Sequence, residues 1–553
     1  MAVLNQSKYV IVTGGVMSGL GKGVTCGSIG RILKSRGLGV INIKLDPYLN
    51  VDPGTMNPAQ HGEVFVTDDG AETDLDLGHY ERFTDVNLTA DCNTTSGQVY
   101  AEVIRRERWG DFLGGTIQVI PHVTDAIKSR ILRQEQTFGA QVLVVEVGGT
   151  IGDMEGLPFV EALRQLKRDV GQENIMYIHL TYVPRLGPSG EFKTKPTQHS
   201  VATLRSIGIL PEVIACRCEQ PLGPATREKI ALFCDVDVDA VISLPTLSDI
   251  YGLPMHLEEE GLGDYICRHL GIDAGPVDLT DWQAMVERSH QHQRELEIAL
   301  VGKYVEATDA YMSVVQALYH AGVANSARVK IRWVDSEAIE CGSADEILAG
   351  VDGVLVPGGF GVRGLEGKIA AAGWARATGT PYLGLCLGMQ MAVVEFARNA
   401  AGVAGAVSYE QDAEAGEQVI LPMPQHHGDI DLGGTMRLGA HPCTIARGTR
   451  AAAAYEVGRV SERHRHRMEF NNAYRNRLQQ AGMVLSGINE DRDLVEIVEL
   501  ADHPWFVGVQ FHPEFKSRPN RPHPLFVGFL RACSAQFPIT KMQTAFQEDL
   551  QLT

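Results

Sequence analysis

Residues 9–25 read YVIVTGGVMSGLGKGVT, a short apolar run followed by a glycine-rich turn that carries Lys22. Residues 9–13, which are mostly β-branched, predict a buried strand, and the amphipathic segment after the turn, through Leu33, predicts a helix. A glycine-rich turn between a strand and a helix presents backbone N–H groups and the positive helix end to phosphate oxygens, which Lys22 can also reach. This stretch therefore predicts an α/β fold with a phosphate-binding loop at its first strand.

The loop departs from the usual G-x-x-x-x-G-K-[ST] pattern at two positions. Gly15 lies one residue too early, and Gly23 stands where Ser or Thr normally supplies a ligand to Mg²⁺. Candidate replacements are Asp74, Asp76 and Glu146, the last at the end of a predicted apolar strand. Because Mg²⁺ takes few protein carboxylates beside substrate phosphates, we expect Asp76 and Glu146 to be its ligands.

Apolar runs recur between helix-length segments along the chain and predict buried parallel strands. Residues 271–294 are polar and are interpreted as a linker, whereas residues 401–429 are rich in Gly, Ala and Glu and predict an irregular surface loop. We predict two doubly wound α/β domains: a P-loop-type, Rossmann-like domain over 1–270 and a second domain over 295–553. The further runs are 40–44, 142–146, 176–180, 213–215, 241–244, 296–301, 329–334, 354–356 and 382–386.

The chain is acidic: 49 Lys and Arg against 68 Asp and Glu give a net charge of −19 over 553 residues. This balance argues against nucleic acid or an anionic membrane surface as a partner, although local cations can still bind small phosphates. Ten cysteines without a C-x-x-C pair predict reduced thiols. Without a signal-like start or an apolar stretch of about 20 residues, we expect a cytoplasmic protein.

Gly384-Leu-Cys386-Leu-Gly388 follows an apolar run and precedes a helical pattern. Glycines on both sides of a nucleophile permit the sharp strand-to-helix turn that exposes its side chain. Near the chain end, His512 follows an apolar run as a candidate base, and Glu514 can orient its imidazole. The glycine turn around Gly359, with the N–H of Leu387, is suited to binding an oxyanion.

A basic cluster, KTKPTQH at 193–199, stands out in the acidic first half. Its two lysines and its hydrogen-bonding side chains suit a triphosphate or a pyrimidine ring.

The cysteine elbow, the distant His-x-Glu and the Pro-Gly-Gly turn resemble a class I glutamine amidotransferase domain. Together with the phosphate-loop domain, they resemble the CTP synthase family over nearly the whole chain. The strings that carry this resemblance are SGLGKG at 18–23, KLDPYLNVDPGTMNPAQHGEVFV at 44–66, GAETDLDLGHYERF at 70–83, VEVGGTIGD at 145–153, KTKPTQHSV at 193–201, PGGFGVRG at 357–364, LGLCLGMQ at 383–390, DLGGTMRLG at 431–439, RHRHRMEFNN at 463–472 and FHPEF at 511–515.

The resemblance implies a ligase in which ATP phosphorylates the uracil O4 of UTP and ammonia from glutamine displaces the phosphate to give CTP. It also implies Mg²⁺ with ATP, activation by GTP, feedback inhibition by CTP and a homotetramer. A sheltered passage for ammonia is implied as well, because only the unprotonated form is nucleophilic.

The resemblance also implies roles for individual residues. The catalytic residues are Cys386, His512 and Glu514, and the metal ligands are Asp76 and Glu146. The ATP site is Gly19, Leu20, Gly21, Lys22, Gly23, Val24, Lys44 and Asp76, with Pro245–Leu247 corresponding to the adenine segment. The UTP and CTP sites are Ser18, Asp153, Met154, Glu155, Lys193, Thr194, Lys195, Pro196, Thr197, Gln198 and Lys229. The glutamine pocket is Gly359, Leu387, Gly388, Met389, Gln390, Glu410 and Arg467, and Arg363 belongs to the GTP region.

Two alternatives remain open at this stage. One is another ATP-dependent amidating ligase with a glutaminase domain, acting on a carboxylate; the 193–198 segment, typical of UTP recognition, argues against it. The other is a regulatory or filament-forming nucleotide-binding protein without catalysis. A non-catalytic protein has no chemical need for Lys22, Cys386, His512 and Glu514 together.

Overall fold

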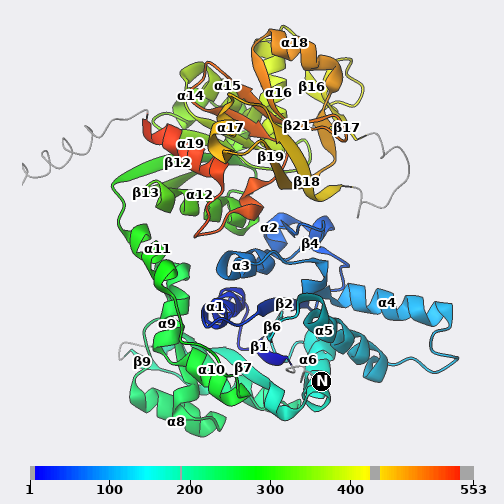
Figure 1. The fold of residues 1–553 in the computed structure, drawn as a ribbon, viewed down its shortest axis with the longest axis vertical. Helices are drawn as coiled ribbons and strands as arrows, with labels where there is room; N and C mark the ends of the chain where they lie inside the picture. Colours follow the sequence, from blue (N-terminus) through cyan, green and yellow to red (C-terminus); the bar gives the residue numbers. More distant parts are fainter. Residues whose placement is uncertain (1–6, 187–189, 424–435, 536–553) are drawn as a thin grey trace, which may run out of the picture. The chain divides into compact units, whose positions relative to one another are not determined.

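The computed structural model describes residues 7–186, 190–423 and 436–535 (Figure 1). The end of the predicted 401–429 loop and the start of the 431–439 string lie outside these residues. The chain divides into two compact units. The first contains residues 1–53 and 76–286, and the second contains residues 54–75 and 287–553.

The first unit is built on a seven-stranded, fully parallel sheet in the order β11-β10-β7-β1-β6-β2-β5. The strands are β1 (Lys8–Gly14), β2 (Val40–Asp46), β5 (Asn93–Thr95), β6 (Val142–Val147), β7 (Ile175–Tyr182), β10 (Val213–Cys218) and β11 (Val241–Pro245). All six strands predicted from apolar runs in this half are present. Only the short edge strand β5, with the polar sequence Asn-Thr-Thr, gave no such signal.

Helices cover both faces of this sheet, as right-handed crossovers between parallel strands require. Figure 1 shows α1 and α5 on opposite sides of the strands. Helix α1 contacts α9, whereas α5 contacts α6. The helices are α1 (Lys22–Ser35), α3 (Leu75–Thr84), α4 (Ser96–Trp109), α5 (Thr124–Phe138), α6 (Leu157–Val170), α7 (Lys195–Ser206), α8 (Pro224–Cys234), α9 (Leu253–Glu259) and α10 (Leu262–Leu270).

The predicted linker contains a helix, α11 (Thr280–His290). Its Trp282 is 2% exposed, donates its indole N–H to the Tyr251 carbonyl at 2.7 Å and lies against Phe83. Met285 and Val286 of the same helix are buried too, so the first part of the predicted linker belongs to the core of the first unit, although its sequence is polar on average.

The second unit has a nine-stranded mixed sheet in the order β13-β12-β14-β15-β23-β22-β21-β18-β19. Strands β13 through β23 are parallel, and β22 through β19 extend the sheet antiparallel. The bounds are β12 (Arg294–Gly302), β13 (Ala327–Asp335), β14 (Gly353–Val356), β15 (Tyr382–Leu385), β18 (Arg437–Ile445), β19 (Arg459–His466), β21 (Met483–Asn489), β22 (Leu494–Leu500) and β23 (Phe506–Val509). The helices are α12 (Met312–Ala324), α13 (Ser336–Cys341), α14 (Ala344–Ile347), α15 (Leu365–Thr378), α16 (Leu387–Asn399), α17 (Arg450–Tyr455), α18 (Arg475–Gln480) and α19 (Pro524–Ala535).

The expectation of an irregular loop over 401–429 is wrong for its described part. This stretch forms β16 (Val407–Ser408) and β17 (Gln418–Pro422), which join β20 (Met468–Phe470) in a small sheet. Val419 and Ile420 are fully buried and belong to the core around α16. The apolar run Val419-Ile-Leu421 is short and lies among polar residues, but it is enough to anchor a short strand.

The segment 54–75 also departs from expectation, because it packs in the second unit rather than with its sequence neighbours. It contains α2 (Pro58–His61) and the hairpin β3 (Phe65–Val66) and β4 (Glu72–Thr73). Glu63 accepts the Ser313 N–H at 3.0 Å and so caps the start of α12. Asp68 pairs with buried Arg463 at 2.5 Å.

Candidate functional site

The glycine-rich loop joins β1 to α1, as predicted. Gly19 and Gly21 have φ of 74° and 85°, in the left-handed region that favours glycine. The Lys22 ammonium donates to the Gly149 carbonyl at 2.7 Å, in the turn that follows β6. Loop and turn therefore meet at the carboxyl end of the sheet, where parallel α/β folds bind ligands.

Gly23, the departure from the usual phosphate-loop pattern, lies against Asp76. A Cβ at position 23 would lie 1.9 Å from the Asp76 Oδ1 atom. The side chain that normally supplies the loop ligand is thus absent, and a carboxylate from α3 occupies its place. The sequence prediction that Asp76 replaces this ligand is consistent with the geometry.

Lys44 joins the two predicted metal ligands. Its ammonium, 4% exposed as a residue, pairs with Asp76 and with Glu146, the latter at 2.8 Å. Burial raises the pKa of Glu146, and Asp76 adds to this effect. Burial would also raise the pKa of Asp76, but Lys44, together with His79 and Lys22, outweighs it, and the pKa of Asp76 is lowered. Two hard oxygen donors beside a phosphate loop fit Mg²⁺, which completes its coordination with substrate phosphates and water.

Asp74, the third candidate carboxylate, lies elsewhere. It belongs to the second unit and faces His61, with 3.6 Å between its Oδ2 and the imidazole Nε2. Asp76 and Glu146 thus meet at Lys44 within the first unit.

A cavity of about 130 Å³ adjoins the phosphate loop. Gly19, Gly21 and Val24 line one side, and Pro245 and Leu247 line the other, so the loop and the predicted adenine segment share one space. Arg217 also lines it and donates to the Pro245 carbonyl at 2.7 Å. Sequence reasoning missed Arg217, although its position between two buried cysteines at the end of β10 was a usable signal.

The predicted pyrimidine-nucleotide segment 193–198 forms the start of α7, which begins at Lys195. The α7 side chain Thr203 lies close to Gly152, and the Ile151 N–H donates to the Gly14 carbonyl at 2.8 Å. The phosphate loop with Ser18, the Asp153–Glu155 turn and α7 are therefore neighbours. Lys193 pairs with Glu191 at 2.7 Å, and Lys195 lies 5.6 Å from the ring centre of Phe233 on α8, the helix that carries Lys229. Met154 is 81% exposed.

In the second unit, Cys386 forms the predicted sharp turn between β15 and α16. Its φ of 50° and ψ of −101° are strained for a residue with a side chain, as expected of a nucleophile on such a turn. Neither flanking glycine tolerates a side chain: a Cβ on Gly384 would lie 2.7 Å from the Gly388 carbonyl carbon, and one on Gly388 would lie 2.1 Å from the Val356 carbonyl oxygen.

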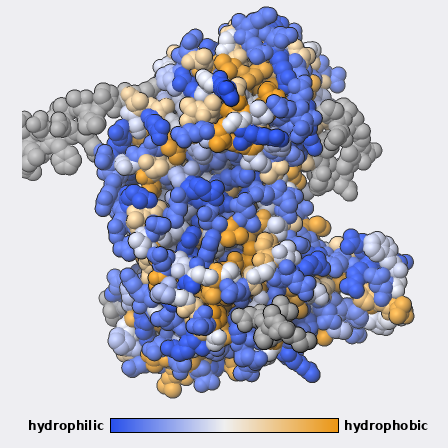
Figure 2. All heavy atoms as spheres, viewed as in Figure 1, coloured by the Kyte–Doolittle hydropathy of each residue, from blue (hydrophilic) through white to orange (hydrophobic). Residues whose placement is uncertain are grey.

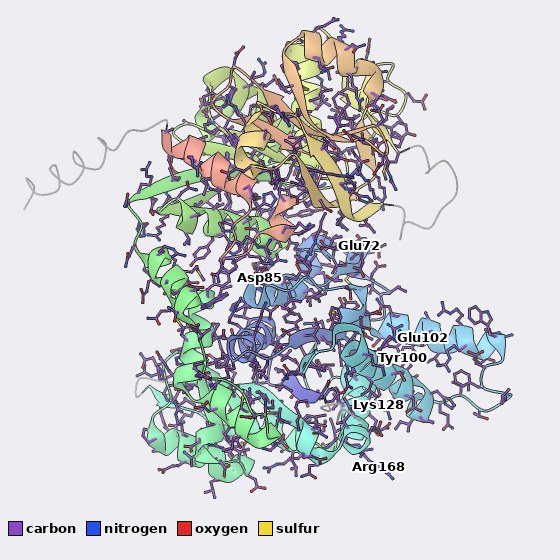
Figure 3. The ribbon with its side chains drawn as sticks, viewed as in Figure 1. Glu72, Asp85, Tyr100, Glu102, Lys128 and Arg168 are labelled. Atoms are coloured by element: carbon purple, nitrogen blue, oxygen red, sulfur yellow. The ribbon has the colours of Figure 1, made fainter. Side chains whose placement is uncertain are left out.

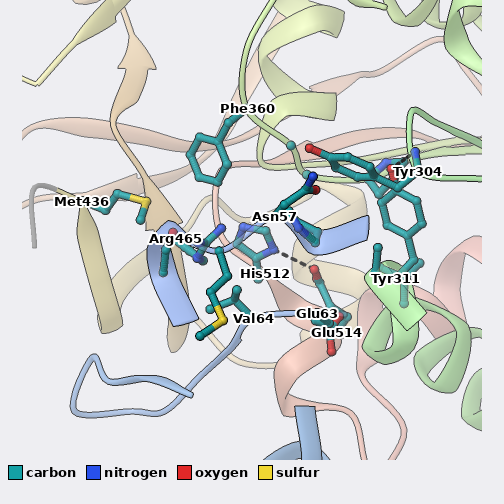
Figure 4. A pocket seen from close by; sticks show the side chains of 18 of the residues that line it. Asn57, Glu63, Val64, Tyr304, Tyr311, Phe360, Met436, Arg465, His512 and Glu514 are labelled. Carbon is teal, nitrogen blue, oxygen red and sulfur yellow. Dashed lines mark hydrogen bonds and ion pairs between the residues drawn. The ribbon is translucent and has the colours of Figure 1, made fainter. Parts of the chain in front are cut away.

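His512 and Glu514 follow β23, the strand paired with β15. Figure 4 shows the hydrogen bond between the His512 Nδ1 and the Glu514 Oε1, 2.7 Å long. Burial disfavours the charged imidazole, but Glu514 and Cys386 outweigh this and raise the pKa of His512 to about 10. The His512 Nε2 is buried, and Cys386 is one of the two residues that raise the pKa of this imidazole, so His512 is placed to take the thiol proton and hold it beside the sulfur. Gly358 lies between the two catalytic side chains: a Cβ on it would lie 2.7 Å from the His512 ring and 3.6 Å from the Cys386 Cβ, so the ring and the cysteine are close neighbours.

A small cavity of about 80 Å³ brings together five predicted residues: Gly359, Cys386, Gln390, Glu410 and Arg467. The Glu410 Oε1 accepts the Gly361 N–H at 2.7 Å, which ties this acid to the glycine turn. Leu387, Gly388 and Met389 are buried in the first turn of α16. The wall is completed by Phe360, His466 and Met468, which were not among the predicted site residues.

A larger cavity of about 610 Å³, drawn in Figure 4, lies beside His512 within the second unit. Residues 54–58 form part of its wall, with Tyr304, Arg363 and Arg465 on other sides. Glu72, labelled in Figure 3, pairs with Arg465 at 2.8 Å and so fixes one side of it. Arg363 pairs with Glu337 at 2.8 Å and donates to the Lys303 carbonyl.

Among the helices of residues 7–186, 190–423 and 436–535, none is both long enough and apolar enough to cross a membrane.

Comparison with known proteins assigns a family to each half. Residues 8–272 match the family described as CTP synthase N-terminus, and residues 306–532 match glutamine amidotransferase class-I. A CTP synthase of Thermomicrobium roseum is 61% identical over 95% of both chains, and one of Chloroflexus aurantiacus is 58% identical over 96% of this chain and 97% of its own. The glutaminase domain of Trypanosoma brucei CTPS, solved with bound acivicin, is 41% identical and covers 43% of this chain and 94% of its own, with a TM-score of 0.41.

Proposed function

This chain belongs to the CTP synthase family, and it is a glutamine-hydrolysing ligase that aminates UTP; we propose that its two described sites divide this reaction as follows. The second unit releases ammonia from glutamine at Cys386. The first unit activates UTP with ATP beside Lys22 and Lys44. The observation that carries the assignment is the single cavity in which Cys386 meets the predicted glutamine-binding residues, with His512 and Glu514 adjacent.

In the glutaminase half, His512 takes the proton of the Cys386 thiol and the sulfur attacks the side-chain amide carbon of glutamine. Glu514 holds the imidazole in the required orientation and stabilises its charged form. The N–H groups of Gly359 and Leu387 stabilise the oxyanion. His512 then returns the proton to the leaving nitrogen, ammonia departs, and water hydrolyses the thioester. Arg467 and Glu410 bind the carboxylate and amino group of the substrate.

In the ligase half, the loop amides around Gly21 and the Lys22 ammonium hold the ATP phosphates. Asp76 and Glu146 would hold Mg²⁺, which would neutralise charge on the transferring phosphoryl group. Lys44 pairs with both carboxylates in the structure. During the reaction it acts as a second cation beside the γ-phosphate. Ammonia displaces the phosphate from the activated C4 position of the pyrimidine.

The larger cavity beside His512 provides a sheltered volume for unprotonated ammonia. Its Arg363 supports a GTP site that stimulates glutamine hydrolysis. The Asp153–Glu155 turn, close to α7, supports a CTP site that overlaps the UTP site. Addition of GTP or CTP to the assay tests both assignments: no stimulation by GTP, or no inhibition by CTP, contradicts them.

We also propose a homotetramer in the cytoplasm. Helix α4 and the loop after it expose Ile104, Trp109 and Leu113, which are 59, 72 and 95% exposed. Figure 2 shows hydrophobic surface at the tip of this projecting segment. Exposed apolar residues in such numbers indicate an interface. Light scattering gives the assembly mass, and a monomer with bound nucleotides contradicts the proposal.

The direct test of the function is an assay of CTP formation from UTP, ATP and Mg²⁺ with either glutamine or ammonium. We expect product with both nitrogen sources. Absence of CTP with both contradicts the assignment.

A further inference from the structure

Two buried side-chain amides lie behind the Cys386 sulfur. Gln390 and Gln510 are 3% and 1% exposed. The Gln510 Nε2 lies 3.8 Å from the Cys386 Sγ, within hydrogen-bond range for sulfur. Neither the resemblance nor the assigned triad gives Gln510 a role.

The hydrogen-bond network fixes which end of each amide faces which neighbour. The Met468 carbonyl can only accept, so the Gln390 Nε2 donates to it at 3.0 Å. The same Nε2 lies 3.3 Å from the Gln510 Oε1, which therefore accepts. Reversing the Gln510 amide would place two donors together. Its N–H₂ group is thus directed at the sulfur.

The strand register explains why Gln510 reaches this place. Strands β15 and β23 are parallel with Leu385 opposite Val509, and the Cys386 N–H donates to the Val509 carbonyl at 2.7 Å. The next residue on each strand is Cys386 and Gln510, which brings their side chains together. The Gln510 N–H donates to the Glu496 carbonyl at 2.9 Å and anchors its backbone.

The sulfur has a second neighbour, which accepts a hydrogen bond from it instead of donating one. The thiol donates to the Arg465 carbonyl at 3.6 Å. This bond exists only while the sulfur carries its proton, because a carbonyl cannot donate to a thiolate. The Gln510 amide, by contrast, forms a stronger hydrogen bond once the sulfur is charged.

We propose that Gln510 is a catalytic residue of glutamine hydrolysis that donates its side-chain N–H to the Cys386 sulfur and stabilises the thiolate. Gln390 is a positioning residue that orients the Gln510 amide. The proposal rests on Cys386 being the nucleophile of the proposed function. Charged or titratable groups that also surround the sulfur are His512 and Glu514 after β23, Lys368 on α15, Glu410 after β16, His466 on β19 and Arg467 after it.

The test measures how fast iodoacetamide alkylates Cys386 between pH 5 and pH 10, by mass spectrometry of the peptide that contains it. The thiolate displaces iodide and forms a carbon–sulfur bond, so the rate reports the thiolate fraction. In the Gln510→Leu full chain we expect the midpoint about one pH unit higher and the neutral-pH rate about tenfold lower. Glutamine-dependent CTP formation is expected to fall by a similar factor.

A matched control is Gln134→Leu, which removes another fully buried amide, from α5 in the first unit. It should leave the alkylation profile of Cys386 unchanged. Ammonia-dependent CTP formation by Gln510→Leu shows whether its first unit remains folded, and near-ultraviolet circular dichroism reports its tertiary packing.

An unshifted alkylation profile in folded Gln510→Leu overturns the proposal. If that variant does not fold, Gln510→Glu decides instead: it replaces the donor by an acceptor and must raise the midpoint further, and an unchanged midpoint overturns the proposal. Alkylation does not depend on CTP formation, so failure of the proposed function and failure of this inference are separately visible.

Discussion

Gly23 and Asp76 occupy one space: a Cβ on Gly23 would lie 1.9 Å from the Asp76 Oδ1 atom. The glycine that breaks the usual phosphate-loop pattern therefore leaves room for the Asp76 carboxylate on α3. Restoring the usual loop residue should damage the site instead of improving it.

We expect Gly23→Ser to lower CTP formation at least about a hundredfold with either glutamine or ammonium, because the new side chain displaces a proposed metal ligand. Glutamine hydrolysis without nucleotides should continue. Gly223→Ser is the control, since a Cβ there meets nothing within 4 Å. Wild-type CTP formation by Gly23→Ser would refute the assigned role of Asp76.

Asp74 and Asp76 form a natural pair of test positions, because they are two residues apart but belong to different units. Asp76→Asn should lower ammonia-dependent CTP formation about a hundredfold and raise the Mg²⁺ concentration required. Asp74→Asn should remain within about threefold of wild type at saturating Mg²⁺. Equal losses of CTP formation in the two variants across a Mg²⁺ titration would contradict the assignment of Asp76, and not Asp74, as a metal ligand.

Glu514 raises the pKa of His512, which predicts a pH-dependent loss of stability in Glu514→Gln. A folded-state pKa of about 10, above the ordinary 6.5, contributes stability that is complete below pH 6.5 and is lost as pH rises through 10. The variant should therefore be destabilised most near pH 6, and the difference should narrow towards pH 10. Thermal unfolding of both chains across this range measures it, and a difference that grows with pH contradicts the assignment.

Lys368 predicts the opposite pH dependence of stability, because the pKa of its ammonium is lowered in the folded chain. Its ammonium is fully buried without a hydrogen-bond partner among the described residues, and burial lowers its pKa to about 7. The unfolded chain binds the proton more tightly, so wild-type stability rises from pH 7 to about pH 10.5. Lys368→Met should be more stable than wild type by a few kcal/mol at or below pH 7, with the gain shrinking above it.

The same thermal unfolding series, run on Lys368→Met, checks this expectation. Lys330→Met is a suitable control, because Lys330 is an exposed residue on β13 that pairs with Glu297. A Lys368→Met chain less stable than wild type at pH 6 would mean that the buried ammonium has a stabilising partner.

The parallel strands were predictable because a strand buried on both faces is apolar throughout, as in β6, where all six residues are buried. The antiparallel strands β18 and β19 were missed for the converse reason. They carry Arg437, Arg463 and His464, buried polar residues that pair inside the fold and resemble surface residues in sequence.

The site residues divide in a similar way. Cys386, His512 and Lys22 were predictable because each chemistry needs a particular residue type beside a turn. Arg217 and Gln510 act through neighbours that only the strand register reveals. The placement of residues 54–75 in the second unit depends on Glu63 and Glu72 finding Ser313 and Arg465 far along the chain, a pairing without any local pattern.

The central claim is that Cys386 produces ammonia while a separate site uses it. The most direct measurement is CTP formation by Cys386→Ala, run in parallel with glutamine and with ammonium at a pH where free ammonia is present. The account predicts that glutamine-dependent formation is abolished and that ammonia-dependent formation stays close to wild type. Loss of both activities in a folded variant, or retention of the glutamine-dependent one, would contradict it.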